Sequence, residues 1–166
     1  MRPIYETPTN RSNEHAAAVA FAGVSQCELL RSAPFSPWDY TFTRAGIPVA
    51  FVEVKCRTNA STKYSDYMIS ASKADGLANA ATAANVAGVL LVQWSDRLGW
   101  LRIDTIDRDK WRYGTGGRFD RNDSLDVERV VFFPVNAFTF LTSPHPDTHT
   151  PPTSAAESGT PPASPT

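Results

Sequence analysis

Three ionisable residues, Asp39, Glu53 and Lys55, have the types and spacing best suited to chemistry. Residues 38–42 alternate in polarity and residues 49–57 are rich in β-forming side chains, which predicts two strands. The intervening residues 44–48 have the composition of a turn. If the strands fold back symmetrically about Gly46, Asp39 faces Glu53 and Lys55 shares their face, while Trp38, Tyr40 and Phe42 occupy the other face.

Two carboxylates opposed across a hairpin repel each other unless a cation lies between them. An all-oxygen pair suits Mg²⁺, which binds one or two carboxylates, waters and phosphate oxygens. Lys55 beside the pair could hold a water or a phosphate oxygen. The alternative is a solvated sheet face. The Glu53-x-Lys55 tripeptide alone favours that alternative, whereas Asp39 placed opposite favours a metal site.

A helix is expected from residue 14 to residue 32, capped by Ser12 or Asn13 and ending before Pro34. Helical spacing gives this segment one apolar stripe, formed by Ala17, Ala18, Phe21 and Val24. Glu14 falls on the same stripe. Taken alone, Glu14 reads as a first-turn carboxylate that the helix dipole stabilises.

A second, alanine-rich helix is expected over residues 71–87, with Ser70 at its N-cap. Lys73 lies in the first turn, where the helix dipole disfavours a cation. Lys73 could reach an anion such as a DNA phosphate beside the helix N-terminus, or it could be an ordinary solvent-exposed lysine. The sequence favours neither interpretation of Lys73 over the other.

Further strands are expected at residues 67–70, 88–94, 100–103 and 127–135. Two strands, a helix and a further strand in this order predict a mixed sheet with a crossover helix. The polar, glycine-containing residues 107–126 read as a flexible loop or as a mobile clamp on the DNA backbone that uses Arg118 and Arg121. Phe138 and Phe140 are expected to pack the end of the domain onto the core.

The 166 residues suit one folded domain, which we expect to span residues 1–141. Residues 142–166 hold seven of the 13 prolines and no Leu, Ile, Val, Met or aromatic residue, so a disordered tail is expected. Without the tail, 16 basic and 15 acidic side chains remain. Any nucleic-acid surface is therefore a local patch.

Several classes of protein are unlikely from composition. No apolar run reaches the roughly 20 residues that a membrane span needs, and residues 1–11 lack the apolar core of a signal peptide. The two cysteines match no metal-ligand spacing, which fits a reducing, intracellular compartment. Isolated histidines offer no zinc site, and no nucleophile-elbow motif supports a serine hydrolase.

The order of these elements resembles the PD-(D/E)XK nuclease superfamily, in particular its small phage-type and Holliday-junction-resolvase-like members. The matching elements are the helix with Glu14, then Ser36-Pro37-Trp38-Asp39, then Glu53-Val54-Lys55, then Ser70-x-x-Lys73 opening a helix. Trp38 stands where the family has its nominal proline, although Pro37 is adjacent. The resemblance implies a restriction-endonuclease-like α/β fold, a central mixed sheet flanked by helices in the core order α-β-β-α-β.

The resemblance also implies roles for individual residues. Asp39, Glu53 and the carbonyl of Val54 would bind Mg²⁺, with Mn²⁺ as a substitute. Lys55 would orient or deprotonate the attacking water, or neutralise charge on the phosphate, and Glu14 would hold the metal through water. The residues expected to contact DNA, from the resemblance and from local charge together, are Arg57, Ser70, Lys73, Arg118 and Arg121.

The implied function is Mg²⁺-dependent hydrolysis of DNA phosphodiester bonds by an endonuclease or junction resolvase. Such a protein would be phage-encoded and act in DNA recombination, repair or processing, in the cytoplasm of a bacterium or of a phage-infected host. The alternative is a catalytically silent nuclease-fold module that binds DNA or a protein partner. A homodimer, and a protein-binding role for the tail, remain compatible with the sequence.

Overall fold

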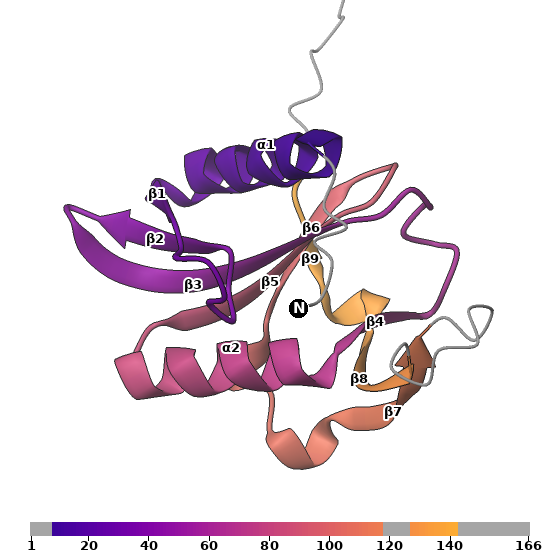
Figure 1. Ribbon diagram of the computed structural model, residues 1–166. Helices are drawn as coiled ribbons and strands as arrows, with labels where there is room; N and C mark the ends of the chain where they lie inside the picture. The colour runs from indigo at the N-terminus through magenta and orange to yellow at the C-terminus, as the bar shows by residue number, and fades with distance from the viewer. Residues whose placement is uncertain (1–7, 118–126, 143–166) are drawn as a thin grey trace, which may run out of the picture.

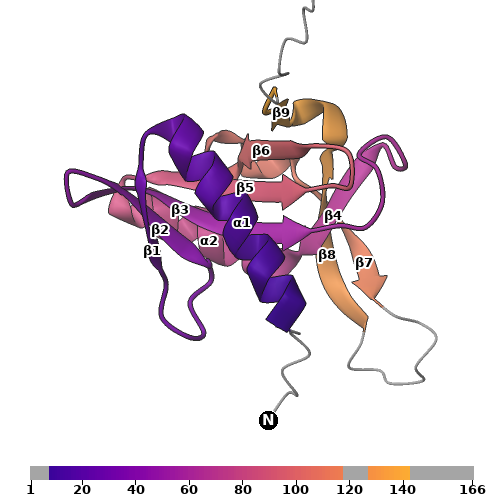
Figure 2. The same cartoon turned by 90° about the horizontal axis from the view of Figure 1, so that it is seen from above.

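A computed structural model describes residues 8–117 and 127–142 of the chain. Two helices lie on opposite faces of a six-stranded sheet, and a three-stranded sheet stands beside them (Figures 1 and 2). The helices and strands are α1 (Pro8–Ser25), β1 (Glu28–Arg31), β2 (Tyr40–Arg44), β3 (Ile47–Cys56), β4 (Asp66–Ser70), α2 (Ala71–Ala84), β5 (Ala87–Gln93), β6 (Leu98–Arg102), β7 (Arg112–Gly117), β8 (Val127–Pro134) and β9 (Thr139–Phe140). Short 3₁₀ turns span residues 103–105, 108–110 and 135–137.

The large sheet has the order β1-β2-β3-β5-β6-β9 and is mixed. β3 pairs with β5 in parallel, and α2 forms the crossover between them, whereas the other neighbouring strands are antiparallel. The helix presents one apolar face to the sheet, formed by Ala71, Ala74, Leu77, Ala78 and Ala81. The mixed sheet with a crossover helix is therefore confirmed.

The first helix is shorter than expected and begins earlier. α1 ends at Ser25, and Gln26 adopts a left-handed φ of 54° that breaks the helix. The expected caps Ser12 and Asn13 lie inside α1, and Glu28–Arg31 forms edge strand β1 instead of continuing the helix. The buried residues of α1 are Ala17, Ala18, Phe21 and Ala22, which are two pairs at i, i+4 spacing. Val24 was expected in the apolar stripe but is exposed.

The hairpin that carries the candidate residues has a two-residue turn with positive φ at Ala45 (49°) and Gly46 (75°). Positive φ at both central positions is typical of a type I′ turn. The turn therefore pairs Arg44 with Ile47 and is not centred on Gly46. A bulge between Phe42 and Thr43 then shifts the register by one residue, so that Phe42 pairs with Ala50 as the symmetric fold-back predicted.

The large sheet separates two apolar clusters. The cluster under α1 lies between this helix and the sheet and includes Phe21, Tyr40, Phe42, Val52 and Leu91. On the face covered by α2, the cluster includes Leu77, Leu90, Trp94 and Ile103, together with residues of the small sheet. Trp38 belongs to the α2 side, where it stacks on Phe51 at 4.0 Å between ring centroids. The expectation that Trp38 shares a face with Tyr40 and Phe42 is wrong, because the chain bends before β2 begins.

The small sheet has the order β4-β8-β7 and was only partly anticipated. β4 and β8 occur where strands were predicted, but residues 112–117 form β7 and are not a loop. Gly114 makes this possible, since a Cβ there would come within 2.8 Å of the Phe132 ring. Residues 118–126, with Arg118 and Arg121, and the predicted tail from residue 143 lie outside the described residues.

The end of the described chain closes the core, as the sequence predicted. Phe138 is buried and contacts Trp94 and Tyr67 edge-on, and the Phe140 ring centroid lies 5.7 Å from that of Trp94. In the part of the chain that the structure describes, no helix has the length and apolar character needed to cross a membrane.

Candidate active site

Glu53 is the centre of the candidate site and is completely buried. It lies on β3 in the middle of the large sheet, between two valines that belong to the cluster under α1. Because side chains alternate along a strand, Glu53 points to the opposite face, toward α2. A carboxylate in such a position needs compensating charge nearby.

Asp39 lies beside Glu53 just before the start of β2. The Asp39 backbone N–H donates to the Val52 carbonyl at 3.0 Å, and the Asp39 Oδ2 accepts from the Val54 N–H at 2.8 Å. Asp39 therefore bonds to the residues on either side of Glu53. The expected ladder pairing of Asp39 with Glu53 is not formed, since β2 begins at Tyr40, but the charge of Asp39 acts on Glu53.

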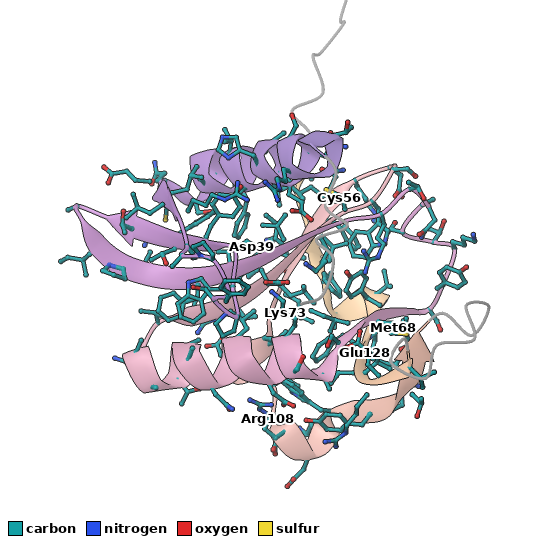
Figure 3. The ribbon with its side chains drawn as sticks, in the orientation of Figure 1. Asp39, Cys56, Met68, Lys73, Arg108 and Glu128 are labelled. Atoms are coloured by element: carbon teal, nitrogen blue, oxygen red, sulfur yellow. The ribbon has the colours of Figure 1, made fainter. Side chains whose placement is uncertain are left out.

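Two ammonium groups approach the buried carboxylate. The Lys55 Nζ lies 2.7 Å from the Glu53 Oε1, and the Lys73 Nζ lies 3.4 Å from both Glu53 oxygens. Figure 3 shows Lys73 between α2 and the large sheet, on the side of the sheet where Asp39 is labelled. From the sequence, Lys73 was expected to contact a DNA phosphate. Its ion pair with Glu53 was not predicted, because it depends on how α2 packs on the sheet and local sequence patterns do not encode that packing.

The electrostatics of the site follow from this packing. Burial raises the pKa of Glu53 above its ordinary value, Lys55 and Lys73 act to lower it, and Asp39 acts to raise it. Burial alone would lower the pKa of Lys55, but the Glu53 and Asp39 carboxylates outweigh that effect and raise it. Lys55 is thus an ammonium group that can donate to a water or to a phosphate oxygen.

The donor set fits a hard divalent cation. In a strand, the N–H and C=O of one residue point to the same side, so the Val54 carbonyl faces the side on which the Val54 N–H meets Asp39. Two carboxylates and this carbonyl form an all-oxygen set, the type that Mg²⁺ prefers. Asp39, Glu53 and Val54 are therefore the residues that could hold the metal.

Glu14 lies on the other side of the sheet from Glu53. It is half-buried on α1, and its charge acts on Tyr40 and Cys56, whose side chains belong to the face that α1 covers. Within residues 8–117 and 127–142, no three His, Cys, Asp or Glu side chains gather closely enough to bind a metal directly. The role of Glu14 through water stays a prediction.

The predicted DNA-contacting residues have different surroundings. Ser70 is at the N-cap position of α2, but its hydroxyl makes no capping bond and instead donates to the Glu128 Oε2 at 2.8 Å. Arg57 follows β3 and places its guanidinium over the Tyr67 ring, 4.9 Å from the centroid. Arg118 and Arg121 belong to the segment that is not described.

Tyr67 on β4 is a residue that the sequence interpretation missed, because it appeared there only as a strand former. Its ring is buried, and its hydroxyl has no hydrogen-bond partner among the described residues. Burial raises the pKa of Tyr67 to about 12, against the lowering effects of Arg57 and Lys55. The hydroxyl therefore lies within electrostatic reach of the candidate site.

Comparison with known proteins agrees with this geometry. A family model described as phage putative PDDEXK endonuclease matches residues 1–141. The chain belongs to this family. A solved Holliday junction resolvase from the archaeal hyperthermophile Archaeoglobus fulgidus superposes with a TM-score of 0.50 at 11% identity, covering 76% of this chain and 84% of the resolvase. No curated protein gives a significant match.

These findings confirm the predicted superfamily and the α/β fold class. At 11% identity, the likeness to the resolvase shows the fold alone. The family match and the juxtaposition of Asp39, Glu53 and Lys55 support a nuclease.

Proposed function

We propose that this PDDEXK family member is a Mg²⁺-dependent DNA endonuclease whose catalytic residues are Asp39, Glu53 and Lys55. The observation that carries the proposal is the fully buried Glu53, which lies beside a second carboxylate and two ammonium groups. Burying an ionised carboxylate is costly, and replacing a buried ion pair by apolar residues is often neutral or stabilising. A role in chemistry explains why this costly arrangement is present.

In this proposal, Asp39, Glu53 and the Val54 carbonyl hold the divalent cation. A bound divalent cation lowers the pKa of a water and polarises a phosphoryl oxygen, which promotes in-line attack on the phosphodiester. The bond between phosphorus and the leaving oxygen breaks as the new bond to the water oxygen forms. The attacking water gives up a proton to solvent, and the leaving oxygen takes one up from solvent. The ammonium of Lys55, held 2.7 Å from Glu53, donates to the attacking water or to a phosphate oxygen.

In the same proposal, Lys73 binds the substrate phosphate in addition to its contact with Glu53. It lies in the first turn of α2 and contacts Glu53 at 3.4 Å, so it is already directed into the site. A phosphate that enters beside Glu53 would meet this ammonium and the N-terminal end of α2 together. Arg57, Arg118 and Arg121 would hold neighbouring phosphates. Glu14 would act on the metal through water.

The test is incubation of the purified chain with linear, circular and four-way-junction DNA in Mg²⁺, Mn²⁺ or EDTA. Cleavage is expected with Mg²⁺ and Mn²⁺ and not with EDTA. Nicking of the circular DNA identifies endonucleolytic cleavage, and the junction tests whether the resolvase likeness extends to substrate. DNA binding without cleavage under all conditions would support the silent binding module instead.

Glu53→Gln identifies the site in the same assay. This variant keeps the size of the side chain and removes its charge, so we expect cleavage to fall by more than about 100-fold, since even outer partners of a metal ligand contribute 10–100-fold. The matched control is Glu28→Gln, which removes the charge of an exposed glutamate on β1. Cleavage by Glu53→Gln at the wild-type rate would contradict the assignment.

A further inference from the structure

A cavity of about 700 Å³ lies next to the candidate site, between the segment after β3 and the small sheet. Its aromatic lining consists of Tyr64, Tyr67, Trp94, Tyr113 and Phe132, and Arg57 lines it as well. A second arginine, Arg112, is held at the wall by an ion pair with Asp66 at 2.7 Å. Met68, another lining residue, marks the place of β4 in Figure 3.

Two lining residues, Arg57 and Tyr67, connect the cavity to the candidate site, since the charges of Lys55 and Glu53 act on Tyr67. Arg57 lies two residues beyond Lys55, directly after the end of β3. Its backbone N–H donates to the Gln93 carbonyl at 2.8 Å, which holds the start of the β3–β4 loop against β5. Tyr67, whose ring lies under the Arg57 guanidinium, has a buried hydroxyl without a hydrogen-bond partner among the described residues. A buried hydroxyl that lacks a hydrogen-bond partner and lies next to a cavity is a candidate hydrogen-bond partner for a ligand in that cavity.

The lining has the chemistry that recognises a nucleobase. Aromatic rings and guanidinium planes stack on bases, and arginine also pairs with the attached phosphate. Tyr64 is the most accessible of these rings, 60% exposed, with Lys63 as its cation partner at 5.2 Å. A cavity of this size is in the range of ligand-binding pockets and can hold a base with its sugar.

A base that enters this cavity cannot remain in a duplex. Base pairing and stacking keep the faces of a paired base covered, so only an unpaired or extruded base can lie between aromatic side chains. We propose that the cavity takes the base of an unpaired nucleotide adjacent to the phosphate that the enzyme cleaves. This inference rests on the proposed nuclease function and narrows its substrate to DNA with a single-stranded element at the cleavage point.

The test uses the full chain carrying Glu53→Gln, so that binding is measured without cleavage. Two DNAs of equal length and sequence are compared, one fully paired and one with a short unpaired branch that carries 2-aminopurine at the junction. We expect tighter binding of the branched DNA and a change in 2-aminopurine fluorescence on binding. Adding Tyr64→Ala should weaken branched binding by about 5- to 150-fold, the range for one lost stacking ring.

Controls separate stacking from other effects. Tyr64→Phe keeps the ring and should restore the preference, while Ile47→Ala removes an exposed apolar side chain at the β2–β3 turn and should change neither affinity. Binding of the paired DNA should change less than twofold in all variants. Equal affinity for the two DNAs before Tyr64 is changed, or unchanged branched binding after Tyr64→Ala, would overturn the inference.

The failure of this inference is distinguishable from the failure of the proposed function. The chain with an intact Glu53 is assayed in parallel for Mg²⁺-dependent cleavage of both DNAs. Cleavage of the two DNAs at equal rates, with no preference in binding, refutes the base pocket and leaves the nuclease. A preference for branched DNA without any cleavage supports the pocket and refutes the nuclease.

Discussion

Asp39 has two separable functions in the structure, and a pair of substitutions distinguishes them. Its carboxylate accepts a hydrogen bond from the Val54 N–H at 2.8 Å, and its charge lies beside Glu53. Asp39→Asn keeps an oxygen that can accept this bond but removes the charge. Asp39→Ala removes both. If Asp39 is a metal ligand, both variants lose cleavage, but only the alanine variant also loses the hydrogen bond.

The difference in stability between the two variants can be estimated from this bond. Val54 is completely buried, and its N–H donates to the Asp39 carboxylate, so truncation of Asp39 removes the partner of a buried donor. Leaving a buried donor unsatisfied costs about 1–3 kcal/mol. Both variants relieve the repulsion between Asp39 and Glu53 equally, so this effect cancels in the comparison. For a domain of this size, the alanine variant should melt about 3–15 °C below the asparagine variant.

The assay combines thermal denaturation, followed by tryptophan fluorescence, with DNA cleavage in Mg²⁺. We expect Asp39→Asn to unfold close to the wild-type midpoint while its cleavage falls to background. Equal midpoints for the asparagine and alanine variants would show that Asp39 does not serve the Val54 N–H. Wild-type cleavage by Asp39→Asn would show that its charge is not needed for the metal.

Two further predictions concern DNA binding and the tail. We expect Arg57, Lys73, Arg118 and Arg121 to neutralise one phosphate each. The logarithm of the affinity for duplex DNA should then fall with the logarithm of salt concentration at a slope of about −4. Arg57→Ala should make this slope shallower by about one unit. A variant that changes sequence preference at an unchanged slope would show that the residue reads bases. Deleting residues 142–166 removes no Leu, Ile, Val, Met or aromatic residue, so the melting temperature should stay within about 2 °C. A decrease of several degrees would show that the segment docks on the domain.

Local patterns in the sequence predicted the elements that carry the site. The β-rich run around Glu53 and Lys55, the turn at Gly46 and the alanine-rich helix after Ser70 all have short-range signals. Alternation along β3 was sufficient to place Glu53 and Lys55 on one face. The family match and the likeness to the resolvase then confirmed the predicted superfamily and fold class.

Other features depend on packing between distant segments, which local patterns do not encode. Leu29 and Leu30 suit a helix as well as a strand, and their pairing with Phe42 and Thr41 decides for β1. Glycines made residues 112–117 look like a loop, although Trp111, Tyr113 and Thr115 alternate and could have signalled a strand. The register of the hairpin was predicted from the wrong turn centre, and the bulge at Phe42 restored it.

The charges around Glu53 suggest why the site combines carboxylates with two lysines. Asp39 and Glu53 carry two negative charges, and Lys55 and Lys73 carry two positive charges, so the four side chains are neutral together. A neutral cluster costs less to bury than isolated charges and gives little attraction to a phosphate. A divalent cation held by the carboxylates would leave an excess of two positive charges in the same space. The ion that the chemistry requires would thus add to the attraction that the basic side chains around the site exert on the anionic backbone, so metal binding would strengthen DNA binding at the cleavage point.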